Sequence, residues 1–306
     1  MKWFQALQQQ LSQHKYAINA KKLGDHAVYA WTNLGYWTPE TESYPQACCQ
    51  LADQLAHAVV LNSKDKLLDL GCGQGASLLN WQNKYKIQDI SAVDVQAKCI
   101  AFLQENLNSK IKLYCASFLN LKNIFPTAYF DVILCIDAAY HSNLNSFLNA
   151  IHDVLNSKGR LGFHYLMLSE KWQQLSHFEQ QKYRYLLKSA DIKIQNLENQ
   201  KNTEKIISNC GFEHIQIIDL SEQVLHGFSQ YIKAADTQLT SLDNIKIQMT
   251  ARLCEKLFKD GLIQYVQISA HKNVKYIAEA KNNKTSLKSE VKYKVVPAHG
   301  FELWTY

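Results

Sequence analysis

Two carboxylates and a run of glycines form the most chemically suggestive pattern in this sequence. Asp69 precedes three glycines at alternate positions, Gly71, Gly73 and Gly75, and Asp94 follows roughly 20 residues further on. Glycine permits positive φ and lets a backbone approach a ligand without a Cβ in the way. A helix that begins after such a turn presents backbone N–H groups that favour an anionic or polar ligand. The pattern predicts a nucleotide-type pocket at the carboxyl end of a parallel strand.

The position of Asp69 separates two kinds of ligand. Gly71-x-Gly73-x-x-Ala76 formally fits the dinucleotide fingerprint, but a dinucleotide strand is usually apolar up to its first glycine. Here an acid stands two residues earlier, where it can face the ammonium of an amino-acid moiety. Asp94 closes the next strand, where a carboxylate can accept hydrogen bonds from both hydroxyls of a ribose. A nicotinamide-dependent oxidoreductase stays open as an alternative.

A second candidate group lies around residues 130–141, where Phe130-Asp131 precedes an apolar run typical of a buried parallel strand. The carboxyl end of that strand faces the same crevice as Gly71, and it leads to Asp137, Tyr140 and His141. Histidine is the usual general base near neutral pH. Packing or capping roles for Tyr140 and His141 stay open.

Aromatic residues are dense around Gly35, in the stretch from Tyr29 to Trp37. Aromatic faces attract cations, so this stretch suits a loop folded over a flat or positively charged ligand. A small satellite core is the alternative. Tyr36 and Trp37 are the residues we expect nearest the ligand.

The segment Asp69–Gly75 closely resembles motif I of the class I S-adenosylmethionine (SAM) methyltransferases. Gly35-Tyr36-Trp37 resembles a segment of small-molecule members such as the tocopherol and ubiquinone-type enzymes, and Ala139-Tyr140-His141 resembles their loop after motif IV. One departure is Ser117, which stands near the point where the family commonly has an acid that pairs with the adenine amino group. The resemblance implies these cofactor-binding residues: Asp69, Gly71, Cys72, Gly73, Gly75, Asp94, Val95, Ser117, Asp137, Tyr36 and Trp37. It also implies that Tyr140 and His141 stand near the methyl group in transit, as the catalytic pair.

The elements that must position these residues alternate between strands and helices. Apolar runs predict strands near 67–70, 90–95, 111–115, 130–136, 158–165, 212–219 and 262–270, with helices between them. The resemblance implies a seven-stranded, mostly parallel, doubly wound α/β sheet with an antiparallel last strand. We divide the chain into an N-terminal helical and aromatic lid (1–62), a SAM-binding domain (63–270) and a Lys-rich C-terminal extension (271–306). A helical cap insertion is expected near 168–200 and a helical segment near 221–257.

Composition limits the partners. The chain has 306 residues, 47% of them hydrophobic, and a formal charge of +6, which does not demand a nucleic acid. The scattered cysteines, the lack of a signal-peptide core and the lack of a ~20-residue apolar run favour a cytoplasmic protein with no bound metal. Trp3, Phe4, Leu7 and Leu11 repeat at helical spacing, which predicts a helix that either packs on the domain or contacts a membrane surface.

The resulting hypothesis is methyl transfer from SAM to a small-molecule acceptor, with no nucleic acid as partner. The aromatic loop favours a lipid, quinone or other metabolite as the acceptor. The acceptor atom (O, N or C), the oligomeric state and the role of the extension are left open. A non-catalytic SAM-binding or scaffold protein is the second alternative.

Overall fold

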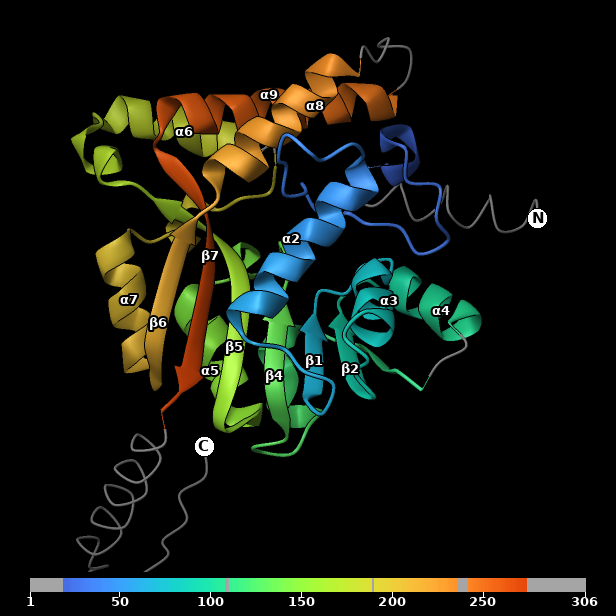
Figure 1. The fold of residues 1–306 in the computed structure, drawn as a ribbon. Coiled ribbons are helices and arrows are strands. Elements are labelled where there is room, and N and C mark those ends of the chain that lie inside the picture. Colours follow the sequence, from blue (N-terminus) through green and yellow to red (C-terminus); the bar gives the residue numbers. More distant parts are fainter. Residues whose placement is uncertain (1–18, 108–109, 189, 236–241, 274–306) are drawn as a thin grey trace, which may run out of the picture.

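Seven strands of the described residues form one sheet, in the order β3-β2-β1-β4-β5-β7-β6 (Figure 1). The computed structural model describes residues 19–273 apart from 108–109, 189 and 236–241. β7 is antiparallel to both of its neighbours, and the other neighbouring pairs are parallel. The predicted fold class is therefore confirmed. The strands are β1 (Lys66–Leu70), β2 (Asp89–Asp94), β3 (Lys112–Cys115), β4 (Phe130–Cys135), β5 (Leu155–Leu168), β6 (Phe212–Asp219) and β7 (Ile263–Lys272).

Helices cover both faces of this sheet because successive residues of each strand point to opposite sides. Val132 and Leu134 of β4 pack with helices α2, α3 and α4, whereas Phe163 of β5 packs edge-on against Phe147 of α5 on the other face, with ring centroids 5.3 Å apart. The helices that flank the strands are α2 (Tyr44–Ala58), α3 (Ala76–Asn83), α4 (Ala97–Asn106), α5 (Leu144–Val154) and α7 (Gln200–Asn209).

A helical cap lies above the carboxyl ends of the parallel strands (Figure 1). It consists of α6 (His177–Lys188), α8 (Gly227–Ala234) and α9 (Leu242–Asp260), with the short helix η4 (Glu170–Gln174) before α6. The predicted helical segment 221–257 is divided, because a π-helical turn, η6 (Glu222–His226), precedes α8. A Cβ at Gly227 would lie 2.5 Å from the Cβ of Trp37, so glycine is needed where the aromatic loop packs on the cap. None of the described helices is long and apolar enough to cross a membrane.

Two predicted segments, the N-terminal helix with Trp3, Phe4, Leu7 and Leu11 and the extension beyond residue 273, lie outside the described residues. All eight cysteines are described, and all are free thiols. Gly211, which follows the end of α7, has a left-handed φ of 84°.

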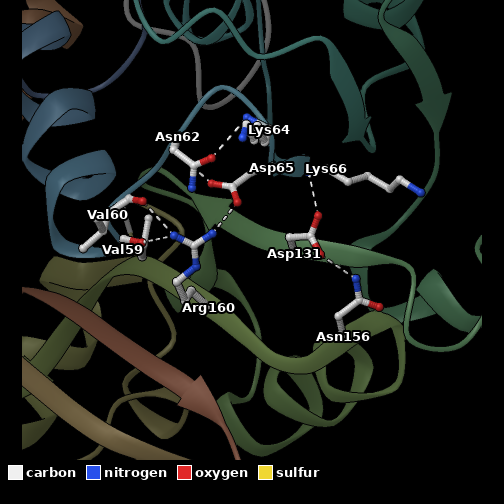
Figure 2. A network of polar contacts seen from close by, with 9 residues as sticks. All are labelled: Val59, Val60, Asn62, Lys64, Asp65, Lys66, Asp131, Asn156 and Arg160. Carbon is white, nitrogen blue, oxygen red and sulfur yellow. Dashed lines mark hydrogen bonds and ion pairs between the residues drawn. The ribbon is translucent and has the colours of Figure 1, made fainter.

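An arginine fastens the end of the sheet opposite the cap (Figure 2). The Arg160 guanidinium donates to the carbonyls of Val59 and Val60, at 2.8 and 2.7 Å, and pairs with the buried carboxylate of Asp65. Val59 and Val60 directly follow α2, and Val60 has a φ of 52°. Arg160 therefore satisfies carbonyls at the end of α2 while it neutralises an acid that precedes β1.

Asp131 makes the matching connection between β1, β4 and β5. Its carboxylate accepts a hydrogen bond from the backbone N–H of Lys66 at 3.0 Å and one from the side-chain amide of Asn156 at 2.7 Å (Figure 2). These polar contacts hold the amino ends of three adjacent strands in register. These structural contacts are at the amino ends, whereas the candidate site lies at the carboxyl ends of the strands.

Arg160→Met should lower the free energy of unfolding by about 3 to 5 kcal/mol, because Asp65 would stay buried without its partner. Urea unfolding followed by circular dichroism measures the change. Lys112→Met, which removes an exposed ion pair with Asp89, is the control and should cost no more than about 1 kcal/mol. Equal losses in the two variants would contradict the importance assigned to Arg160.

Candidate active site

Asp94 ties the glycine loop to the end of β2. Its Oδ2 accepts a hydrogen bond from the backbone N–H of Gly73 at 2.9 Å, and its Oδ1 accepts one from the N–H of Gln96 at 2.8 Å. The N–H of Gly71 donates to the Val93 carbonyl at 2.8 Å. The turn after β1 and the turn after β2 therefore share one carboxylate, and Asp94 is only 6% exposed.

Two of the loop glycines each face a different segment. Gly71 has a φ of 79°, and a Cβ there would lie 2.9 Å from the Cβ of Ala138, in the turn after β4. Gly73 has a φ of 51°, and its Cβ would lie 3.3 Å from the hydroxyl of Thr32. The loop is thus enclosed by the β4 turn on one side and by the aromatic stretch on the other, which explains why glycine is needed at both positions.

Cys72 and Gly75 complete the turn through their backbones. The Gly75 N–H donates to the Cys72 carbonyl at 2.9 Å, and Gly75, with a φ of 88°, stands directly before α3. The Cys72 side chain is buried and packs in the core. Any ligand contact from Cys72 must therefore come from its main chain.

Asp69 is buried beneath the loop. Its Oδ2 accepts a hydrogen bond from the Trp81 indole N–H at 2.6 Å, and Ser77 is a second side-chain partner. Burial, reinforced by the charge of Asp94, raises the pKa of Asp69 to about 6, although both hydrogen bonds act in the opposite direction. The carboxylate thus holds α3 against β1, and its predicted contact with an ammonium group stays a prediction.

Val95 and Ser117 lie at the ends of neighbouring strands, because the Ala116 N–H donates to the Asp94 carbonyl at 3.0 Å. Val95 is 71% exposed, which leaves an apolar surface at a position that the resemblance assigns to the cofactor. The Ser117 hydroxyl accepts the N–H of Leu119 at 3.2 Å and so caps a short helix. Its hydroxyl proton can still be donated to a ligand.

The aromatic loop, residues 29–37, is fixed by its own polar groups. The Tyr44 hydroxyl donates to the Asn33 carbonyl at 2.8 Å, and the Trp37 indole N–H donates to the Leu34 carbonyl at 2.8 Å. The Trp37 ring stacks on Tyr231 of α8, with centroids 4.3 Å apart. Trp37 therefore joins the loop to the cap, and its predicted role at a cofactor stays a prediction.

Tyr36 is the neighbouring aromatic residue. It is half-buried, and its backbone N–H donates to the Ala47 carbonyl of α2 at 2.8 Å. Gly35 must be glycine here, because its Cβ would lie 2.6 Å from the Cβ of Ala47. The loop consequently lies tight against α2 and beside the glycine turn.

Asp137 joins three separate segments of the chain. Its Oδ1 accepts the hydroxyls of Tyr265 on β7, at 2.8 Å, and of Tyr140, at 3.3 Å, and its Oδ2 lies 3.4 Å from the N–H of Leu34 in the aromatic loop. Its φ of 56° is rare for a residue other than glycine, although aspartate tolerates it better than most. Burial raises the pKa of Asp137, and hydrogen bonds from Tyr265, Leu34 and Tyr140 partly offset this effect.

His141 lies in the short helix η3 (Ala139–His141) and is held by residues from the cap insertion. Its Nδ1 lies 3.3 Å from the carbonyl of Asp191, and the side-chain amide of Asn196 donates to the His141 carbonyl at 3.1 Å. Partial desolvation lowers the pKa of His141, so the ring is mostly neutral at pH 7. Because a carbonyl only accepts, this contact favours the tautomer with its proton on Nδ1 and its lone pair on Nε2.

Sequence reasoning missed the residues that support this site from a distance. From the sequence, Tyr265 was only one residue of the strand predicted near 262–270. Asp191 and Asn196 were only residues of the cap insertion predicted near 168–200. Their contacts with Asp137 and His141 span 50 to 128 positions, and no local signal indicates them. Among the described residues no group of three His, Cys, Asp or Glu side chains is arranged to hold a metal ion.

Comparison with known proteins agrees with this geometry. A family model described as a methyltransferase domain matches residues 67–159, which contain the glycine loop, Asp94 and His141. An erythromycin 3''-O-methyltransferase of Saccharopolyspora erythraea is 29% identical over 138 residues, which cover 43% of this chain and 44% of that protein. A sterol 24-C-methyltransferase of Candida albicans is 24% identical over 214 residues, 67% of this chain and 54% of that protein.

The fold agrees as well. A geranyl diphosphate C-methyltransferase of Streptomyces coelicolor, solved with S-adenosyl-L-homocysteine, matches with a TM-score of 0.66 at 15% identity, over 87% of this chain and 98% of that one. Residues 67–159 of this chain therefore match a methyltransferase domain, and its fold is that of a solved methyltransferase. The matched part spans about half the length, or less, of the curated relatives named above. The match to a methyltransferase domain is limited to residues 67–159, and the activity and substrate of the whole protein are proposals.

The Asp137 junction should show coupling between β4 and β7. Asp137→Asn and Tyr265→Phe should each lower the free energy of unfolding by about 1 to 3 kcal/mol. In the double variant the two losses should be non-additive by about 0.5 to 3 kcal/mol, because the residues share one hydrogen bond. Urea unfolding of the four proteins of the cycle measures this quantity.

Tyr85→Phe is the matched control, because it removes a hydrogen bond of 2.9 Å from a tyrosine to another aspartate, Asp53. Its loss should add to that of Asp137→Asn within about 0.5 kcal/mol. Additivity between Asp137→Asn and Tyr265→Phe would mean that the junction does not act as a unit.

Proposed function

We propose that this chain is a SAM-dependent methyltransferase that transfers a methyl group to a small-molecule acceptor in the cytoplasm. The observation that carries the proposal is Asp94, which is held at the carboxyl end of β2 by the N–H of Gly73 in the matched domain. A pocket in this position, with a glycine turn on one side and an acid on the other, suits a nucleoside with an amino-acid group. Solved relatives of this fold hold S-adenosyl-L-homocysteine or sinefungin, which supports the same choice.

The residues present fit SAM. Asp94 stands at the carboxyl end of β2, and a carboxylate with about four acceptor sites suits the two hydroxyls of a ribose. Val95 offers an exposed apolar side chain to the adenine, and Ser117 a hydroxyl proton. Gly71, Cys72, Gly73 and Gly75 would contact the amino-acid end through main-chain atoms. Asp69 would act on its ammonium group, directly or through the turn that it supports.

When bound, SAM supplies a methyl group on a positively charged sulfur, which is already activated for transfer. The residues of this chain then need to align the acceptor, exclude water and remove a proton. We assign proton removal to Nε2 of His141, because the Asp191 carbonyl favours the tautomer with its lone pair there. Tyr140 lies beside it, with ring centroids 4.6 Å apart, and Asp137 holds the Tyr140 hydroxyl. Tyr36 and Trp37 would cover the sulfonium side, where aromatic faces favour a cation.

We assign the acceptor to the class of lipids, quinones and other apolar metabolites. The aromatic loop and the half-buried or buried aromatic residues of the insertion, such as Trp172 and Tyr183, support this choice. In this division of the chain, the N-terminal segment (1–62) and the insertion (168–200) would together cover the rest of the SAM-binding domain (63–270). Peripheral membrane contact through the segment that begins with Trp3 and Phe4 is part of the same proposal. Nucleic acid is not proposed as a partner.

The direct test is incubation of the protein with SAM labelled on its methyl group and a bacterial metabolite and lipid extract, followed by identification of the labelled product. The proposal expects one labelled small molecule. A protein that binds SAM with ordinary affinity but labels nothing would be a non-catalytic binder, and one that binds NAD in preference to SAM would be an oxidoreductase.

Asp94→Asn should raise the dissociation constant for SAM at least tenfold, as expected for loss of a hydrogen-bonded carboxylate contact. Isothermal titration calorimetry measures the affinity, and urea unfolding checks that the turn is retained. Asp89→Asn, at the opposite end of the same strand, should change the constant less than twofold. Unchanged affinity in Asp94→Asn would remove this residue from the site.

His141→Gln should lower kcat by about 100-fold or more once the acceptor is known, whereas KM changes little. In the native enzyme, activity should fall as the pH drops below the lowered pKa of His141, because the protonated ring cannot accept a proton. The Gln variant should lose this acidic limb of the profile. His177→Gln on α6 is the control and should retain kcat; an unchanged kcat in His141→Gln, with chemistry rate-limiting, would make His141 structural.

A further inference from the structure

Helix α6 presents two large aromatic side chains to solvent. Phe178 is 68% exposed and Tyr185 is 75% exposed, and their spacing of seven positions places both on one face of the helix. Tyr183 and Leu187, which point the other way, are buried against the rest of the cap. The outward aromatic face is therefore not needed for the packing of α6.

Basic side chains flank this aromatic face on both sides. The ammonium of Lys182 lies 4.5 Å from the Phe178 ring centroid, and Arg184 and Lys188 follow at exposed positions. The one acid of the helix, Glu179, accepts hydrogen bonds from the Ser176 hydroxyl, at 2.6 Å, and from its N–H, at 2.8 Å. Within the part of the chain that the structure describes, none of the three basic residues of α6 makes an ion pair.

Helix α9 also carries exposed apolar and basic side chains. The ammonium of its Lys256 lies 5.4 Å from the ring centroid of Tyr183, so α9 and α6 are neighbours at the top of the molecule (Figure 1). Further along α9, Met249 is 57% exposed and Ile245 is 43% exposed, and the exposed Arg252 follows on the same side of the helix. Exposed apolar groups and positive charge thus recur on both outer helices of the cap.

We propose that the cap surface formed by Phe178, Lys182, Arg184 and Tyr185 of α6 docks on an anionic lipid bilayer. Aromatic side chains such as Phe and Tyr favour the boundary between head groups and acyl chains, and Lys and Arg beside them attract lipid phosphates. The inference goes beyond methyl transfer, since it requires neither SAM nor an acceptor.

The position of α6 in the chain adds to the argument. α6 belongs to the insertion whose later residues, Asp191 and Asn196, contact His141. Docking through α6 therefore places the membrane against the same insertion that borders the candidate base. An acidic protein or a nucleic acid fits less well, because α6 carries only two more basic than acidic residues and its exposed face is centred on apolar rings.

Sedimentation of the full chain with large unilamellar vesicles tests the proposal, with equimolar phosphatidylcholine and phosphatidylglycerol compared with phosphatidylcholine alone. The partition coefficient should be at least tenfold higher for the anionic vesicles and should fall in about 1 M salt. Phe178→Ser/Tyr185→Ser and Lys182→Glu/Arg184→Glu should each reduce it at least tenfold, since one basic residue contributes about fivefold.

Two matched variants serve as controls. Val60→Ser/Ile218→Ser removes exposed apolar side chains outside the cap, and Lys64→Glu/Lys122→Glu reverses exposed charges outside it. Both should bind vesicles within twofold of the wild type. Circular dichroism checks that every variant is folded. If Phe178→Ser/Tyr185→Ser does not fold, Lys182→Glu/Arg184→Glu alone tests the proposal.

Three results would overturn the proposal: no sedimentation with anionic vesicles, equal binding to neutral vesicles, or cap variants that bind as the wild type does. The first would assign the cap surface to an acidic protein or a nucleic acid. The last, with binding retained, would assign membrane contact to another part of the chain.

Discussion

The shared carboxylate of Asp94 is the interaction on which the candidate site depends. By accepting the N–H groups of Gly73 and Gln96, it holds together two turns that come from different strands. The constraint is electrostatic as well as steric, because the buried acid also helps to raise the pKa of Asp69 beneath the loop. The glycines then follow as a requirement, since Gly71 and Gly73 lie where a Cβ would press on neighbouring segments.

A second carboxylate, Asp137, fixes the turn after β4 in the way that Asp94 fixes the turn after β2. Asp137 joins the turn after β4 to β7 through Tyr265 and to the aromatic loop through Leu34. His141 is held in turn by the cap insertion, through the Asp191 carbonyl and the Asn196 amide. The candidate site thus lies between the sheet, whose opposite end is held by Arg160, and the helices of the cap (Figures 1 and 2).

The sequence predicted the fold correctly and marked the turns at Gly71–Gly75 and Asp94, because both depend on local signals. Strand periodicity and alternating glycines mark β1, β2 and the turn between Gly71 and Gly75, and the residues around Asp94 lie close to them in the chain. The part of the candidate site nearest the cap depends on contacts between distant segments, such as Tyr265 with Asp137 and Trp37 with Tyr231. Hydrophobic patterns do not encode such pairings, so Trp37 was expected at the ligand without its stack on α8, and the helical segment 221–257 without its π-turn.

The most direct measurement is a crystal structure of the protein grown with S-adenosyl-L-homocysteine. The account predicts the ribose hydroxyls within hydrogen-bonding distance of the Asp94 carboxylate, the adenine beside Val95, and the amino-acid end against the main chain of the glycine loop. A nucleoside bound elsewhere, or a crevice beside Gly73 that excludes it at saturating concentration, would contradict the central claim.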